Sequence, residues 1–459
     1  MILELSSSMR GVVIQPGDPD YDRAREVYNA MIDRRPALIA QCTDVSDVIA
    51  AVNFGREHGL LVAIRGGGHS GPGLGVCEGG LVIDLSMMKG VRVDLAQRTA
   101  RVAGGCTWAD VDHATHAFGL ATPSGLISTT GVGGLTLGGG IGHLSRKCGL
   151  AIDNLLEADM VLANGRFVTV SASEHPDLFW AIRGGGGNFG VVTSFVFKLH
   201  PIDTVYGGPM FWPLEKSAEI MHWYRDFITH APNDMNGFFA FHTVPAGPPF
   251  PEHLHGQKMC AIVWCYTGPP DQEEAIFSPI RAKFGSPAID FAGPVPYPAL
   301  QSMFDGIYPP GYQWYWKADF VNELSDEAIA EHITFASTMP TPWCGMHLYP
   351  IDGAAGRKDQ GETAWNYRGA KWGQVMVGVS PDPADNPEAI AWTRAYWEAL
   401  HPHSAGGAYV NMMMDSTDEG QDRVRASYGA NYDRLAAIKA TYDPSNFFRV
   451  NQNIEPQHV

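Results

Sequence analysis

The order of apolar and polar residues over the first 200 positions predicts short strands alternating with helices. Residues 44–59 carry apolar side chains at helical spacing, with Ser46 as the expected N-cap and Gly59 as the stop. The elements expected next are strands at 60–65, 81–86 and 91–105 and a helix at 108–118. This alternation favours an α+β arrangement.

A glycine-rich stretch, 131–142, interrupts the pattern and holds too many glycines for a stable helix interior. Strands are expected to resume at 157–165 and 166–172. Residues 175–201 read as a short helix, a glycine turn and an apolar strand that closes the first region. The backbone, not the side chains, is therefore expected to provide the function of 131–142.

Beyond residue 203 the strands become longer and alternate with amphipathic helices, which indicates a second domain. The strands expected are 258–268, 312–321 and 372–380, and the helices 215–231 and 325–337, the last with Ser325 as N-cap. The final stretch returns to helix and loop and can rejoin the first region. At 459 residues the chain is longer than a single hydrophobic core usually stabilises, so two domains are expected from its length alone.

The net charge and composition of the chain limit the kinds of molecule that it is expected to bind. The formal charge of -17 argues against nucleic acid and anionic membranes, which both rely on concentrated Lys and Arg, and favours a small neutral or cationic molecule. No run of about 18 apolar residues occurs, and the N-terminus lacks a secretory pattern, so a cytoplasmic location is the expectation.

Cysteine and histidine spacing gives no sign of a metal or a disulfide framework. The seven cysteines are odd in number and form no CxxC pair. His253 and His255 lie in a Pro-rich loop without the neighbours of a metal site. Reduced thiols and no bound metal are the expectation.

Two segments satisfy GxGxxG, RGGGHSG at 65–71 and GGGGNFG at 184–190. Neither lies between a strand and a following helix, so neither fits a Rossmann dinucleotide site. Successive backbone N–H groups in such turns can instead hold a diphosphate without basic side chains. The alternative is that the glycines only form tight turns.

Five motifs, in order, carry a resemblance that spans nearly the whole chain: RGGGHS, GVGGLTLGGGIGHLSRKCGLAIDN, RGGGGNFGVVTSF, AYVN and YDPSNFFRVNQNI. The chain resembles the berberine-bridge-enzyme-like oxidoreductases of the vanillyl-alcohol-oxidase type. The resemblance implies a two-part PCMH-type FAD-binding domain, residues 1–203 and 413–459. It also implies a substrate domain, 204–412, with an antiparallel sheet covered by helices.

In this family the histidine of the first glycine loop is bonded to the flavin, and His69 occupies that place. The other cofactor-binding residues that the resemblance implies are Arg65, Gly66, Gly67, Gly68, Ser70, Thr129, Thr130, Gly131, Gly133, Gly134, Gly138, Gly139, Gly140, Gly142, Val192, Asn451 and Gln452. Many relatives add a cysteinyl bond, but Ile127 and Ser128 stand where that thiol would be. A single histidyl link to FAD is therefore expected, with Cys148 as a small buried or site-lining residue.

For the chemistry, the resemblance points to Tyr409 of AYVN as the base, with Asn411 on the same face of an expected strand. A free tyrosine has a pKa of about 10, so this role requires neighbours that stabilise the phenolate. The alternative is a tyrosine that only packs on the flavin.

Substrate contacts are expected from three aromatic residues. Tyr367 matches a family position that borders the substrate, although this chain reads NYR where relatives often read PHR. Alternation along 312–321 places Trp314 and Trp316 on one face of a strand, where they can line the cleft or pack in the core. A sugar ring or a planar metabolite would suit such walls.

These features predict an FAD-dependent oxidase that removes a hydride from an alcohol-type carbon of a small molecule. The resemblance places Thr130 where relatives have the Val or Leu that opens or closes the oxygen pocket, and because Thr is close to Val in shape, O₂ is favoured as the acceptor. A dehydrogenase, a tailoring enzyme that closes rings or oxidises amines, and a noncatalytic flavin-binding protein are the alternatives.

Overall fold

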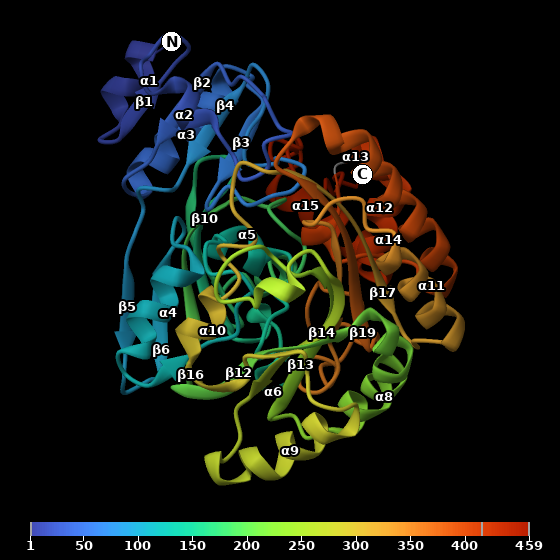
Figure 1. Ribbon diagram of the computed structural model, residues 1–459. Helices are drawn as coiled ribbons and strands as arrows, with labels where there is room; N and C mark the ends of the chain where they lie inside the picture. The colour runs from blue at the N-terminus through green and yellow to red at the C-terminus, as the bar shows by residue number, and fades with distance from the viewer. Residues whose placement is uncertain (1, 415, 458–459) are drawn as a thin grey trace.

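The computed structural model describes residues 2–414 and 416–457 and confirms the α+β fold. Two sheet-based parts lie side by side, with the N-terminal region and the C-terminal segment together on one side (Figure 1). No helix among the described residues is long and apolar enough to cross a membrane.

Two sheets form the first part. The smaller has the order β1-β2-β4-β3, in which β2, β3 and β4 are parallel, and the larger is antiparallel with the order β5-β6-β10-β8-β9. The strands are β1 (Val12–Ile14), β2 (Leu38–Gln41), β3 (Val62–Arg65), β4 (Leu81–Asp84), β5 (Val91–Asp94), β6 (Thr99–Ala103), β8 (Leu155–Val161), β9 (Phe167–Ser171) and β10 (Val191–Lys198). A two-stranded ribbon joins β7 (Leu120–Ala121) and β11 (His200–Pro201).

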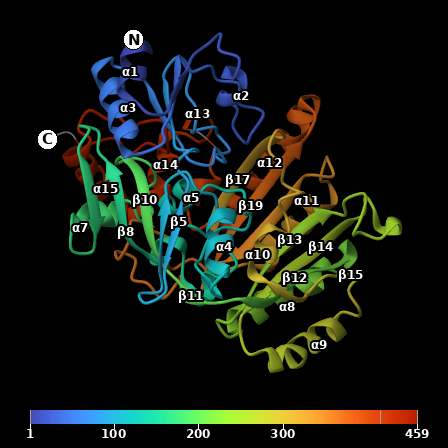
Figure 2. The ribbon, with the colours of Figure 1, turned by 90° about the vertical axis from the view of Figure 1, so that its left-hand side faces the viewer.

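Short helices surround these sheets, namely α1 (Ile2–Ser8), α2 (Tyr21–Arg25), α3 (Val45–Glu57), α4 (Trp108–His116), α5 (Val132–Leu137), α6 (Ser145–Cys148) and α7 (Pro176–Ala181). The C-terminal helices α13 (Ser416–Glu419), α14 (Gln421–Tyr428) and α15 (Tyr432–Tyr442) return to this part. Figure 2 shows α15 beside α7, and Phe447 and Phe448 share a core with α3 and β4.

The second part is one eight-stranded sheet with the path β15-β12-β14-β13-β18-β19-β17 and with β16 paired to β12. All its pairings are antiparallel. The strands are β12 (Thr204–Pro213), β13 (Met235–Thr243), β14 (Lys258–Tyr266), β15 (Ile289–Asp290), β16 (Gly293–Pro296), β17 (Gln313–Val321), β18 (Gly345–Pro350) and β19 (Trp372–Ser380).

Four helices cover one face of this sheet, α8 (Ser217–His230), α9 (Glu273–Lys283), α11 (Asp326–Ser337) and α12 (Asn386–Leu400), while α10 (Tyr297–Ser302) lies against α4. Figure 2 shows α8 and α9 on the side turned away from the first part. Because side chains alternate across a strand, every second residue of β13, β17, β18 and β19 points to the opposite face, toward the first part. That face forms one wall of the site.

Local structure corrects two expectations. Asp44, not Ser46, caps α3, because its side chain accepts a hydrogen bond from Asp47 N, whereas Gly59 follows the helix in the left-handed region as expected, with φ of 61°. The glycine-rich stretch does contain a helix, α5, whose Val132 and Leu137 are buried, so core packing overrides the low propensity of its glycines. Ser325 caps α11 by accepting from Ala328 N, as predicted.

Candidate active site

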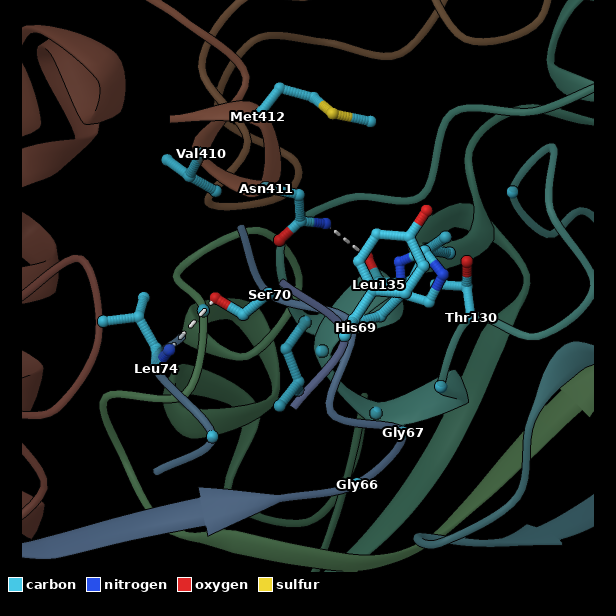
Figure 3. A pocket seen from close by; sticks show the side chains of 18 of the residues that line it. Gly66, Gly67, His69, Ser70, Leu74, Thr130, Leu135, Val410, Asn411 and Met412 are labelled. Atoms are coloured by element: carbon cyan, nitrogen blue, oxygen red, sulfur yellow. Dashed lines mark hydrogen bonds between the residues drawn. The ribbon is translucent and has the colours of Figure 1, made fainter. Parts of the chain in front are cut away.

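A cavity of about 350 Å³ lies between the loops of the first part and the free face of the large sheet. Its walls come from the loop after β3, the stretch that leads into α5, the turn before β10, the strand face and the segment around residue 410. Figure 3 shows His69, Thr130 and Asn411 among the side chains around it. The glycine motifs and the C-terminal motifs, far apart in sequence, therefore meet at one site.

His69 lies in the loop that follows β3 and is held by a ring stack. Its imidazole stacks on Tyr28 with ring centroids 3.8 Å apart, and Nε2 lies 3.4 Å from Thr129 Oγ1. Burial lowers the pKa of His69 to about 4, so the ring is neutral at physiological pH. A neutral imidazole keeps a nitrogen lone pair that can bond to carbon.

Two glycine loops meet backbone to backbone beside this histidine. A Cβ on Gly67 would lie 2.5 Å from the backbone nitrogen of Gly131, and a Cβ on Gly131 would lie 2.4 Å from that of Gly67. Only glycine allows this approach, because such contacts overlap the van der Waals radii. This contact agrees with the expectation that the backbone of the stretch 131–142, and not its side chains, forms this part of the site.

Asn29 ties the histidine loop to the substrate-domain sheet. Its side-chain nitrogen donates to Gly71 O at 2.6 Å and to Trp314 O at 2.8 Å, while its oxygen accepts from Trp314 N at 2.9 Å. A Cβ on Gly71 would overlap the Trp316 ring at 2.1 Å. The loop that carries His69 is therefore fixed directly against β17.

Tyr409 and Asn411 lie together, but not on a strand. Residues Val410–Met412 form a single 3-10 turn, and the two side chains still meet because Asn411 Nδ2 donates to Tyr409 Oη at 2.9 Å. Gly140 N donates to the same oxygen at 2.9 Å. The sequence did not identify these two N–H donors, which are neighbours of the kind that a phenolate would require. Burial raises the pKa of Tyr409, and the bonds from Gly140 and Asn411 oppose that rise.

Most of the predicted cofactor-binding residues line the cavity, including Arg65, Gly133, Gly134 and Val192. Five do not: Thr129, Gly138, Gly139, Gly140 and Gly142. The structure gives three of these glycines a different role, because a Cβ on Gly138 would overlap Asn411, one on Gly139 would crowd Tyr409, and Gly140 donates to Tyr409. They position the expected base instead of lining the cavity.

Gly142 and Thr129 also act through neighbours, since Gly142 packs on the carbonyl of Ser124 and Thr129 contacts His69. Tyr367, expected at the substrate, does not line the cavity: its hydroxyl donates to Ala426 O at 2.7 Å and its ring stacks on Phe320. Cys148 lies outside the cavity in a small apolar cluster near Cys265.

Trp314 and Trp316 both line the cavity, and neither indole N–H has a hydrogen-bond partner among the described residues. Buried Trp N–H groups usually find a partner, so both are free to bind a ligand oxygen. The C-terminal Asn451 and Gln452 also line the cavity, each with an unpartnered side-chain oxygen within the described part of the chain. These orphaned polar atoms indicate where a bound molecule would be held.

Sequence reasoning missed four polar residues of the cavity wall: His242, His347 and Tyr349 on the strand face, and Tyr308 in the loop before β17. His242 and His347 each lie at a cavity-facing position of a strand, between residues that point to the helices. The sequence analysis predicted neither strand, because residues 238–241 are continuously apolar and β18 is short. The pairing of β13 with β18, which brings the two histidines together, cannot be read from either segment alone.

Comparisons with known proteins agree with this geometry. The model of a protein family described as "FAD binding domain" matches residues 36–171. The model of a second family, described as "Berberine and berberine like", matches residues 408–455. An FAD-linked oxidoreductase of Dictyostelium discoideum is 33% identical over 99% of this chain and 97% of its own length. (R)-6-hydroxynicotine oxidase of Paenarthrobacter nicotinovorans is 30% identical over 98% of each chain. The crystal structure of 6-hydroxy-D-nicotine oxidase from Arthrobacter nicotinovorans superposes with a TM-score of 0.87, at 25% identity, over 98% of this chain and 99% of that one.

Proposed function

Because this chain belongs to the berberine-bridge-enzyme-like family of FAD-linked oxidoreductases, we propose that it is an oxidase that acts on an alcohol-type carbon of a small molecule, such as a sugar or a secondary metabolite. FAD is joined to the chain by a single bond to His69, and O₂ is the electron acceptor. The observation that carries the proposal is the hydrogen bonding of Tyr409 Oη by Gly140 N and Asn411 Nδ2 on the cavity wall.

The residues around the cavity fit FAD. The abutting backbones of Gly67 and Gly131 leave a surface without side chains, and the unpartnered side-chain oxygens of Asn451 and Gln452 can bind a nucleotide's N–H groups. When bound, FAD supplies the hydride acceptor. The chain's own residues supply binding, orientation and proton transfer.

A single attachment through His69 agrees with the lining of the cavity. His69 is neutral and stacked, and none of the described lining residues is a cysteine. Covalent attachment removes the need for affinity to retain the cofactor, so the cavity can be wide enough for a bulky substrate.

Tyr409 is the proposed base. As the substrate carbon loses its hydride, the substrate hydroxyl passes its proton to Tyr409 Oη, and the alcohol becomes a carbonyl. Deprotonated, that oxygen retains two hydrogen-bond donors, Gly140 N and Asn411 Nδ2, which stabilise its negative charge. The Trp365 ring packs beside Gly139, the neighbour of Gly140, because a Cβ on Gly139 would lie only 3.0 Å from it.

Thr130 supports the choice of O₂, because it lines the cavity and has nearly the shape of valine. Oxidation of an amine is the second candidate, and the 30% identity to (R)-6-hydroxynicotine oxidase favours it. Against it, no Asp or Glu occurs among the described lining residues to pair with an ammonium group.

The proposal is tested with the purified holoenzyme. Acid precipitation should leave the yellow colour in the pellet, and His69→Ala should release it to the supernatant, whereas Cys148→Ala should behave as wild type. A substrate screen then records anaerobic bleaching of the flavin and peroxide release in air. Bleaching without peroxide would replace the oxidase by a dehydrogenase, and a colourless pellet from the wild type would overturn the histidyl bond.

A further inference from the structure

A second cavity, of about 220 Å³, lies outside the proposed active site, where α4 of the first part packs against α10 of the second. Figure 1 shows these two helices side by side. Within the described part of the chain, the two cavities share no lining residue. The proposed oxidation therefore does not use this second cavity.

The inner end of the second cavity is formed by Asp112 and Ser128. Asp112 is 2% exposed and Ser128 4% exposed, whereas the lining residues Ala109, His113 and Ser302 are exposed. The residues that α4 contributes recur every three or four positions, so they lie on one face of the helix. The cavity thus leads from exposed residues at its rim to a buried carboxyl group.

The Asp112 carboxyl group is unsatisfied, because neither Oδ1 nor Oδ2 has a hydrogen-bond partner among the described residues. The Gln301 amide lies close enough to lower the pKa of Asp112, but its Nε2 donates to Ser124 Oγ at 2.5 Å. Gln301 Oε1 is buried and also lacks a partner within the described chain. Since buried polar atoms are nearly always paired, these three oxygens point to a bound molecule that donates hydrogen bonds.

The charges around this cavity favour a cation. Burial raises the pKa of Asp112 to about 8, and the Asp305 carboxylate adds to that rise. Ser128 cannot serve Asp112, because its N and Oγ donate to Asp305 at 3.0 and 2.6 Å. At the rim, His116 Nδ1 lies 3.2 Å from Asp203 Oδ1. No Lys or Arg is among the described lining residues, so a positively charged ligand would supply the partner that an ionised Asp112 lacks.

We propose that this cavity binds the primary ammonium group of a small organic molecule, with the ammonium on the Asp112 carboxylate and the alkyl part beside Ala109 and Pro298. A primary ammonium has three N–H donors, which match the two oxygens of Asp112 and Gln301 Oε1. The volume far exceeds the space that one water molecule needs. A metal ion fits less well, because no group of three His, Cys, Asp or Glu side chains in the described chain could hold one.

The test is a ligand-observed NMR titration of the holoenzyme with n-propylammonium chloride at pH 8.5. At this pH most of the Asp112 carboxyl group is ionised, while an alkylamine, with a pKa of about 10.4 like that of lysine, keeps its proton. The wild type should bind propylammonium at least about tenfold more tightly than 1-propanol, which has no charge, and than tetramethylammonium, which has no N–H donor.

Two variants should each weaken propylammonium binding at least about tenfold. Asp112→Asn keeps the shape of the side chain but removes its charge. Ala109→Leu places a bulky, helix-favouring side chain at the exposed rim, so it keeps the test decisive if Asp112→Asn does not fold. Asp203→Asn is the matched control, because it removes a mostly exposed carboxylate near the rim, and it should change the affinity less than about twofold.

Unchanged affinity in Asp112→Asn and Ala109→Leu would place the amine elsewhere and overturn the site. Equal binding of 1-propanol or tetramethylammonium, or no binding of propylammonium by the wild type, would overturn it as well. Anaerobic bleaching of the flavin by propylammonium would place the amine in the first cavity. The site does not depend on the proposed oxidase activity, so a substrate screen without flavin bleaching would refute the oxidase alone.

Discussion

Lys439 Nζ lies 2.6 Å from Asp443 Oδ2, and both side chains are completely buried. The same ammonium donates to Asn188 O at 2.6 Å and to Phe448 O at 2.9 Å. Asp443 in turn accepts from the backbone nitrogens of Phe447 and Phe448. This pair joins the end of α15 to the glycine turn before β10, so the C-terminal segment and the cavity wall depend on each other.

Lys439→Met is expected to lower the free energy of unfolding by about 3–5 kcal/mol, because it leaves the buried Asp443 carboxylate without its partner. Urea denaturation measures the loss. Lys358→Met is the matched control, since Lys358 pairs with Glu362 at i,i+4 on the surface and should cost no more than about 0.5 kcal/mol. If both variants lost the same free energy of unfolding, the buried pair would contribute no more to stability than the surface pair does.

The rate of flavin reduction is expected to rise about tenfold per pH unit between pH 7 and 9. Burial raises the pKa of Tyr409 above its usual value of 10, so the base is mostly protonated in this range and its active form increases with pH. Anaerobic stopped-flow absorbance gives the rate. Tyr409→Phe should lower it by about 10²–10⁴-fold and abolish the slope. A steep slope that survives in Tyr409→Phe would assign the base to another group.

Gly138→Ala is expected to slow flavin reduction by displacing Asn411. The new Cβ would lie 2.2 Å from Asn411 Oδ1, and that side chain is held by bonds to Leu135 O and Tyr409 Oη. Stopped-flow rates for Gly138→Ala, Asn411→Ala and the double variant should coincide within a factor of about three, because all three remove one donor. Gly293→Ala, whose Cβ would meet nothing within 4 Å, is the control. Additive effects in the double variant would refute this explanation.

The free energy of unfolding is expected to fall as the pH drops from 6.5 toward 4. Burial lowers the pKa of His332 to about 3, so below pH 6.5 the unfolded state binds a proton at this residue that the folded state does not. Each such group contributes a slope of about 1.4 kcal/mol per pH unit. Urea unfolding at several pH values should show that His332→Phe removes about this much of the slope.

Tyr396→Phe provides the control for this measurement. It removes the hydroxyl that lies 2.7 Å from His332 Nδ1 but keeps the buried imidazole. The slope should then persist at a lower overall stability. If Tyr396→Phe flattened the slope as much as His332→Phe, the hydrogen bond and not the titration of His332 would explain the pH dependence.

Local sequence determined much of this protein. The spacing of apolar residues fixed α3 and α11, and strand alternation placed Trp314 and Trp316 on one face, because these periodicities depend only on backbone geometry. The glycine and C-terminal motifs, through their resemblance to a family, indicated FAD and singled out His69. Neither required knowledge of which strands pair.

Tertiary structure decided the rest. His242 and His347 are 105 residues apart, and they meet because β13 pairs with β18, a choice that no local pattern encodes. In the same way, only the packed chain places Gly140 N against Tyr409, 269 residues away, and turns three glycines from an expected cofactor cradle into supports for the proposed base. Contacts of this kind arise from the joint packing of distant segments, and the sequence of one segment cannot specify them alone.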